Sequence, residues 1–140
     1  MQDFVHLHVH TQYSLLDGQA SVARLVDKAM KNGMKGIAVT DHGNMFGIKE
    51  FTNYVNKKNS GPKGEVKDLK KRIAGIEAGT IECEDKEAEI AACKAKIVEA
   101  ENKLFKPIIG CEMYVARRTM DLKEGKPDQS GYHLIVRSEE

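Results

Sequence analysis

Residues 36–44 read Gly-Ile-Ala-Val-Thr-Asp-His-Gly-Asn, and this segment gives the clearest indication of the fold class. It begins with a short, almost wholly apolar run, which is typical of a parallel strand covered on both faces. Polar residues, starting with Asp41 and His42, follow where such a strand would end. We therefore expect a buried parallel strand that carries polar side chains at its carboxyl end.

A helix is expected on each side of this strand. Before it, Ser21 is suited to be an N-cap, apolar residues recur at helical spacing over residues 22–30, and Gly33 is suited to end the helix. After it, the spacing of apolar residues predicts a second helix that carries Ile48, Phe51, Tyr54 and Val55.

Residues 4–10 alternate strictly between two faces, which predicts a first strand. Val5, Leu7 and Val9 form its apolar face, and the opposite face carries Phe4, His6, His8 and His10. The resulting order of strand, helix, strand and helix implies a parallel α/β architecture.

Residues 59–104 differ in composition from the rest of the chain. Apolar residues spaced by three and four predict two amphipathic helices with a loop near residues 79–85, that is, an antiparallel helical hairpin. We expect this hairpin to be an insertion, with residues 1–58 and 105–140 forming the other domain. Its many Lys and Glu side chains are expected to be mainly solvated faces.

The remainder of the chain returns to strand character. Residues 106–116 are expected to form a strand, with Ile108, Gly110, Glu112 and Tyr114 on one face. Residues 117–131 are polar and punctuated by glycine and proline, so they predict a loop. A last strand begins at Tyr132, and we expect it to be parallel to the others.

The bulk composition excludes several classes of protein. With 140 residues, 41% of them hydrophobic and 31% charged, the chain is globular, but it is short for a closed barrel, so part of any barrel would be missing. No apolar stretch approaches about 20 residues and no signal peptide is evident, which predicts a cytoplasmic location. Three cysteines without C-x-x-C spacing indicate neither a disulfide framework nor a cysteine zinc site, and a net charge of +1 gives no argument for nucleic acid.

Histidines and carboxylates gather at the expected strand ends. In a parallel α/β fold, the carboxyl ends of the strands meet around one crevice. The residues expected there are His8, His10, Asp17, His42, Glu112 and His133. Mixed imidazole and carboxylate ligands suit zinc, manganese or iron, and they differ from the cysteine ligands of a structural zinc site.

Several histidines and carboxylates in or beside this set also have a simpler interpretation. His6 shares the histidine face but lies deeper in the strand, so we interpret it as a packed or hydrogen-bonded side chain. Asp41 could cap the following helix, or it could orient an imidazole beside the metal. His133 alone would be interpreted as structural. A carboxylate such as Glu112 on an apolar strand is costly to bury without a partner, and it therefore indicates a cation nearby.

The motifs resemble a known family. The segment His8-Val9-His10-Thr11-Gln12-Tyr13-Ser14 matches the H-x-H-T-x-x-S opening of PHP (polymerase and histidinol phosphatase) domains. Longer strings, in this order, are similar to bacterial DNA polymerase III alpha subunits: residues 4–10 continuing into 14–18, then 39–47, 106–115 and 132–135. A histidinol phosphatase would share only the H-x-H and D-H-G pieces.

This resemblance implies a fold and a set of ligands. Several family members form a distorted (β/α)7 barrel, so the chain would be a truncated part of such a barrel, interrupted by the hairpin. Two or three divalent metals would be bound, Zn or Mn, with Fe as a further option. The ligands implied are His8, His10, Asp17, His42, Glu112 and His133, with Asp41 and Ser14 behind them. Later motifs of the family, a further histidine and an Asp-x-His pair, have no counterpart here.

The resemblance also implies a function. An intact site of this type hydrolyses phosphoesters, which in a polymerase subunit would mean proofreading. The chain would be the N-terminal part of a replicative polymerase that uses Mg, DNA and other replicase subunits, but it would lack the polymerase domain and have little or no hydrolytic activity alone. A protein partner for the hairpin is possible, and no membrane is implied.

Two alternatives stay open. One is a stand-alone PHP phosphatase that acts on a small phosphomonoester. The other is a non-catalytic module whose metal site holds the fold together while the hairpin docks a partner protein.

Overall fold

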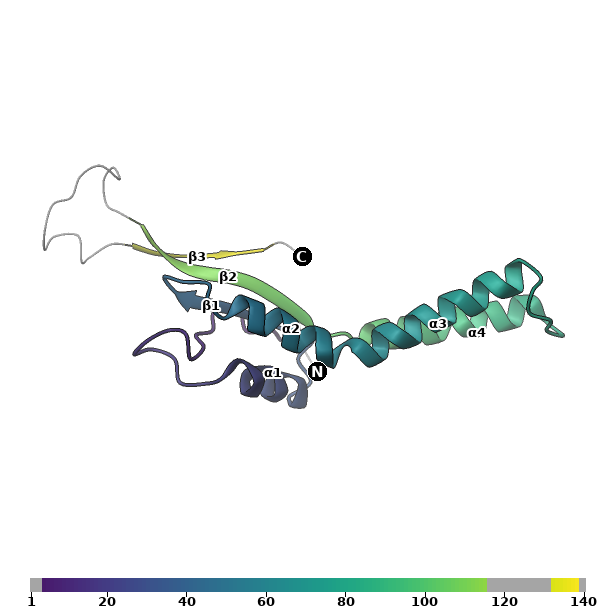
Figure 1. The fold of residues 1–140 in the computed structure, drawn as a ribbon, viewed down its shortest axis with the longest axis horizontal. Coiled ribbons are helices and arrows are strands. Elements are labelled where there is room, and N and C mark those ends of the chain that lie inside the picture. Colours follow the sequence, from purple (N-terminus) through teal and green to yellow (C-terminus); the bar gives the residue numbers. More distant parts are fainter. Residues whose placement is uncertain (1–3, 116–131, 139–140) are drawn as a thin grey trace, which may run out of the picture. The chain divides into compact units, whose positions relative to one another are not determined.

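The computed structural model describes residues 4–115 and 132–138 (Figure 1). Within these residues it has four helices and a three-stranded sheet: α1 Val22–Lys31, β1 Gly36–His42, α2 Ile48–Lys58, α3 Ser60–Glu77, α4 Lys86–Asn102, β2 Lys106–Val115 and β3 Tyr132–Arg137. The chain divides into two compact units, Met1–Val55 with Lys106–Glu140, and Asn56–Phe105. None of the described helices has the length and apolar content needed to cross a membrane.

Helix α1 begins and ends where the sequence predicts. The side chain of Ser21 accepts a hydrogen bond from the Arg24 amide at 3.5 Å, as an N-cap does. At the other end, Gly33 has a φ of +75°, the left-handed conformation in which glycine commonly ends a helix. The helix buries Val22, Val26 and Ala29.

Strand β1 confirms the predicted buried strand. Its residues from Gly36 to Asp41 are buried, and only the final residue, His42, is partly exposed. β1 pairs in parallel with β2, and the register places His42 beside Glu112. Helix α2 follows β1 and buries Phe51 and Val55, so the helices predicted before and after this strand are both confirmed.

The predicted first strand is wrong, because residues 4–10 form no strand. The segment does lie along β1: the Ala38 amide donates to the His6 carbonyl and the Thr40 amide donates to the Val9 carbonyl, both at 2.9 Å. Ala38 and Thr40 are two residues apart on β1, whereas their partners His6 and Val9 are three residues apart on the segment. The segment therefore has one extra residue, which interrupts the ladder as a bulge does. The strict alternation fails with it, since Leu7 is 45% exposed.

The predicted direction of the last strand is also wrong. The strand order is β1-β2-β3, and β3 runs antiparallel to β2. A parallel return needs a long crossover, usually a helix, whereas the preceding sequence has the polar, glycine-punctuated composition of a loop, which suits an antiparallel return. That predicted loop, residues 117–131, lies outside the described residues. The described sheet is open, so the barrel stays a prediction.

The second unit contains helices α3 and α4, which pack against each other side by side (Figure 1). Ile76 on α3 and Cys93 and Ala100 on α4 are buried. Arg72 and Glu89 form an ion pair at 2.8 Å between the two helices. Asp85 caps α4 by accepting a hydrogen bond from the Ala88 amide at 3.0 Å.

Candidate metal centre

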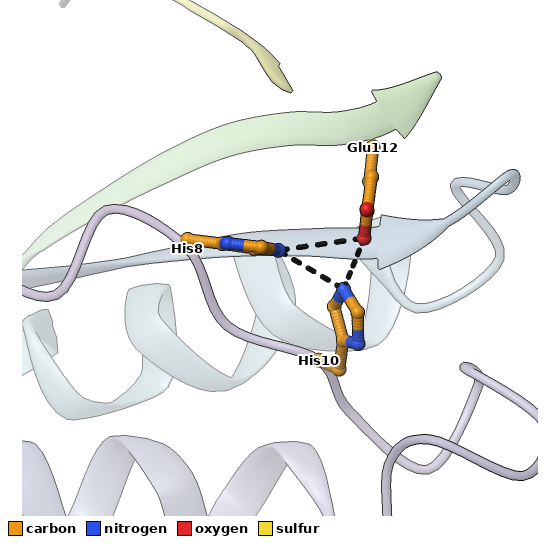
Figure 2. A group of neighbouring side chains, drawn as sticks. All are labelled: His8, His10 and Glu112. Atoms are coloured by element: carbon orange, nitrogen blue, oxygen red, sulfur yellow. Dashed lines mark hydrogen bonds and ion pairs between the residues drawn. The ribbon is translucent and has the colours of Figure 1, made fainter. Parts of the chain in front are cut away.

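The carboxylate of Glu112 on β2 is surrounded by imidazoles. Its Oε2 lies 2.5 Å from His10 Nε2, 3.3 Å from His42 Nδ1 and 3.4 Å from His8 Nε2. Its Oε1 lies 2.8 Å from His133 Nδ1. Figure 2 shows His8, His10 and Glu112 pointing toward one another. Side chains from distant parts of the sequence therefore converge on one carboxylate.

The four imidazoles reach this point from three backbone settings. His42 is the last residue of β1 and is the register partner of Glu112 in the parallel ladder. His133 comes from the beginning of antiparallel β3, where it is opposite Tyr114. His8 and His10 come from the irregular segment beside β1. The antiparallel β3 thus contributes the start of a strand, not its carboxyl end.

One side of the cluster is open to solvent. The side chain of Glu112 is 9% exposed, whereas those of His8 and His133 are 49% and 44% exposed. A molecule from solution can therefore approach the two outer imidazoles while the carboxylate stays at the base of the cluster.

The imidazoles also determine the ionisation of Glu112. Burial on its own would raise the pKa of this carboxyl group, but hydrogen bonds with His133, His42, His10 and His8 lower the pKa from 4.5 to about 2. The carboxylate is therefore ionised at neutral pH. It is a permanent anion in a position where a cation would be stabilised.

Two other candidates lie away from the centre. Asp17 is half-exposed, and its Oδ2 lies 3.9 Å from His42 Nδ1, so it approaches the cluster without entering it. His6 is exposed and its ring lies edge-on against Phe4, with centroids 4.8 Å apart. Neither residue belongs to a group of described side chains that could hold a metal ion.

Asp41 is buried and binds the loop that follows His10. Its Oδ1 accepts hydrogen bonds from the Thr11 amide at 2.6 Å and from Ser14 Oγ at 2.7 Å, and its Oδ2 accepts one from Thr11 Oγ1 at 2.8 Å. Ser14 Oγ in turn accepts a hydrogen bond from the His42 amide at 3.0 Å. Asp41 therefore links the segment that carries His10 to the end of β1, through hydroxyl groups and a backbone amide.

Comparison with protein families gives a match to the PHP domain over residues 6–140 of the chain. The chain belongs to the PHP domain family. The sequence-based assignment to this family is thus confirmed.

Known relatives of this PHP domain are DNA polymerase III alpha subunits. The subunit of Treponema pallidum is 36% identical over 134 residues and that of Borreliella burgdorferi is 37% identical over 136 residues, in each case over 95% of this chain and 8% of the relative. The subunit of Aquifex aeolicus is 54% identical over 50 residues, which is 36% of this chain and 4% of the relative. The chain thus spans less than a tenth of the length of these subunits.

The donor set of this PHP domain fits divalent metal ions. Two groups of described side chains each have their ligand atoms within 4.8 Å of one another: His8 with His10 and Glu112, and His42 with Glu112 and His133. Both groups share Glu112, which offers one oxygen toward three imidazoles and the other toward His133. Imidazole nitrogens with a carboxylate are ligands typical of zinc, manganese or iron.

Two residues near the centre were not singled out by the sequence. Thr11 was part of the matched motif, yet nothing in its spacing indicated that it would donate to Asp41. Tyr114 was placed correctly on the face of Glu112, but its contact with His42 depends on the three-dimensional arrangement.

Proposed function

We propose that the chain is the N-terminal PHP portion of a DNA polymerase III alpha subunit, and that its centre hydrolyses phosphodiester bonds at the 3′ end of DNA. The proposal is supported by the similarity to alpha subunits over 95% of the chain. The observation that carries the chemistry is the convergence of imidazoles on the buried carboxylate of Glu112.

The residues of the chain have separate roles in this proposal. His8 and His10 would hold one cation, His42 and His133 a second, and Glu112 would bridge the two. Asp17 would complete the coordination of His42's cation, or contribute to a third site. Bound divalent cations supply a hydroxide by lowering the pKa of a bound water, and they stabilise negative charge on phosphoryl oxygens.

The open side of the cluster is where the phosphate would be received. His8 and His133 are the more exposed ligands, so a phosphate could approach the cations that they would hold from this side, without displacing Glu112 at the base of the site. Asp41 and Ser14 would hold His10 and His42 in a fixed position relative to each other, since their hydrogen bonds join the His10 loop to the His42 backbone. We propose zinc or manganese as the bound metal, with iron as a further option.

We propose that the activities of the intact subunit require parts of the protein beyond this chain. Polymerisation with Mg²⁺, binding of DNA and contacts with other replicase subunits are proposed for the full-length protein, which acts in the cytoplasm. The chain alone, which spans 8% of its two long-matching relatives, is proposed to bind metal but to hydrolyse DNA weakly or not at all.

Residues 59–104 are proposed to be an insertion in the PHP domain. β1 and β2 are parallel neighbours, and α2 already provides a helix for the crossover between them. The pair α3 and α4 is therefore additional to what the crossover requires. An exposed helical pair of this kind would suit contact with a partner protein.

The test is metal analysis of the purified chain followed by hydrolysis assays on single-stranded DNA and on p-nitrophenyl phosphate. We expect about two equivalents of bound metal and little turnover of either substrate. Turnover of only the small ester would favour a stand-alone phosphatase. Absence of bound metal after loading with Zn²⁺ and Mn²⁺ would contradict the metal centre. Bound metal with no hydrolysis even by the full-length subunit would instead favour the non-catalytic alternative.

A further inference from the structure

Tyr114 contacts the centre although it is not a candidate ligand. It follows Glu112 by two residues on β2, so both side chains lie on the same face of the strand. Its ring lies edge-on against His42, with centroids 4.8 Å apart, and against His133, with centroids 5.0 Å apart. Its hydroxyl group is hydrogen-bonded with Nε2 of His42.

The ring of Tyr114 occupies space that a side chain at position 43 would otherwise fill. Gly43 has a φ of +67°, and a β-carbon at this position would lie 2.9 Å from Cε2 of Tyr114. The Gly43 amide donates to the Glu112 carbonyl at 2.8 Å, which ties the turn after β1 to the strand that carries the tyrosine. The position of the phenol next to His42 therefore follows from the fold itself.

The two nitrogens of His42 have chemically different partners. Nδ1 faces Oε2 of Glu112 at 3.3 Å, and Nε2 faces the hydroxyl of Tyr114. A neutral imidazole donates from one nitrogen and accepts at the other. The ionised carboxylate can only accept a hydrogen bond, whereas a phenol can donate or accept. Tyr114 is thus a partner that is compatible with both tautomers of His42.

We propose that Tyr114 is a positioning residue that allows His42 to change tautomer when a cation binds at Nδ1. This inference rests on the proposed metal centre. Without a cation, Nδ1–H donates to Glu112 and the phenol donates to Nε2. With a cation at Nδ1, the proton is on Nε2 and is donated to the phenol oxygen. The imidazole carries one proton in both forms, so no proton is gained or lost.

The exposure of Tyr114 agrees with this exchange of roles. The residue is 61% exposed, so its hydroxyl hydrogen can turn toward water when the oxygen accepts from Nε2–H. In the metal-bound form, a partner on the second nitrogen of a histidine ligand stabilises that tautomer and the ring orientation, and its loss typically weakens metal binding by about 10- to 100-fold.

The test compares Tyr114→Phe with the unsubstituted chain and with Tyr54→Phe. The control removes a phenol that donates to Asp27 at 2.9 Å, outside the cluster. Zn²⁺ affinity is measured by competition with a chelating dye, and the tautomer of His42 is read from its ¹⁵N chemical shifts with and without Zn²⁺. We expect about tenfold weaker binding in Tyr114→Phe, unchanged binding in Tyr54→Phe, and a shift of His42 from Nδ1–H to Nε2–H when zinc is added to the unsubstituted chain.

Two results would overturn the inference. One is Zn²⁺ affinity in Tyr114→Phe within about twofold of the unsubstituted chain. The other is a His42 tautomer that does not change on zinc binding, a measurement that needs no variant and holds even if Tyr114→Phe fails to fold. If the unsubstituted chain binds neither Zn²⁺ nor Mn²⁺, the metal centre and the hydrolysis proposed for it fail together. Normal Zn²⁺ binding with either of the two results removes only the role of Tyr114.

Discussion

At the scale of single residues, Glu112 differs from every other member of the cluster because it belongs to both candidate ligand groups. Removing it takes away a shared anion, whereas removing one histidine takes away a single donor. The two kinds of substitution should therefore differ in how much metal they release.

Metal content should show this difference. We expect Glu112→Ala to lose most of the bound metal and His42→Ala to lose roughly half, because His42 belongs to one group only. His6→Ala is the matched control, since His6 precedes His8 in the same segment but lies outside both groups. Elemental analysis after dialysis gives the stoichiometry. Unchanged metal content in both Glu112→Ala and His42→Ala would remove these residues from the site.

The acid stability of the metal-free chain should also depend on Glu112. The pKa of this carboxyl group in the folded chain, about 2, is below its ordinary value of 4.5, so the fold favours the ionised form. This contribution, at most about 3 kcal/mol, is complete above pH 4.5 and is lost as the pH falls toward 2. Urea unfolding of the metal-free chain and of Glu112→Gln, at several pH values, measures it. We expect the difference in unfolding free energy to shrink from pH 6 to pH 3, and a constant difference would contradict this.

Much of the site could be predicted at this scale, because residue type carries the signal. Imidazoles and carboxylates at expected strand ends indicated His8, His10, His42, Glu112 and His133, and these converge. The partners of Asp41 could not be predicted. Whether a buried aspartate accepts from an imidazole or from hydroxyl groups depends on distances that a one-dimensional pattern does not contain.

At the scale of elements, the irregular segment before α1 is held to β1 mainly by side chains. Thr11 Oγ1 lies 3.0 Å and 2.8 Å from the two oxygens of Asp41, and both residues are buried. Hydrogen bonds to a buried carboxylate are stronger than those between neutral groups. The segment should therefore be sensitive to loss of this hydroxyl group.

Thr11→Val tests this contact, because valine keeps the branched shape and removes only the hydroxyl. We expect a loss of about 1.5–3 kcal/mol in unfolding free energy, measured by urea denaturation. Thr52→Val is the control, since within the part of the chain that the structure describes its hydroxyl bonds to carbonyls of its own helix, and a change within about 0.5 kcal/mol is expected there. Equal effects of the two substitutions would show that the Thr11 hydroxyl does not anchor the segment to Asp41.

The β2–β3 pairing depends on a glycine. A β-carbon at Gly110 would lie 2.5 Å from the Val136 carbonyl oxygen and 2.9 Å from Cγ2 of Thr40. We expect Gly110→Ala to lower the unfolding free energy by about 1–3 kcal/mol, because backbone must move. Gly64→Ala, in α3, meets nothing within 4 Å and should instead stabilise by about 0.5–1 kcal/mol. Thermal unfolding of both variants gives the comparison, and a neutral Gly110→Ala would contradict the close approach.

Elements were predictable where a local rule determined them. The cap at Ser21, the stop at Gly33 and the apolar run of β1 all act within a few residues, and all three are confirmed. The two errors concern pairing between distant segments. The extra residue between His6 and Val9, and the direction of β3, depend on which backbone groups meet in space.

At the scale of the whole molecule, the structures of the two compact units were predicted from different kinds of sequence pattern. The helices of Asn56–Phe105 follow from a repeat of apolar residues along one stretch of sequence. The other unit joins residues from both ends of the chain, and its parallel pairing of β1 with β2 was predicted from the apolar run of β1 together with the order of elements.

The bulge beside β1 has a consequence for the order in which the fold opens. The segment is attached by two backbone hydrogen bonds to its His6 and Val9 carbonyls, by the Val9 amide to Thr40 Oγ1 at 2.9 Å and by the Thr11 amide to Asp41, and not by a continuous ladder. A cation held jointly by His10 and Glu112 would fasten this segment to β2, and would slow hydrogen–deuterium exchange at the Val9 and Thr11 amides while leaving α1 unaffected. Withdrawal of the ion would then leave the segment without a fastening to β2, and local opening of the domain would be expected to begin there.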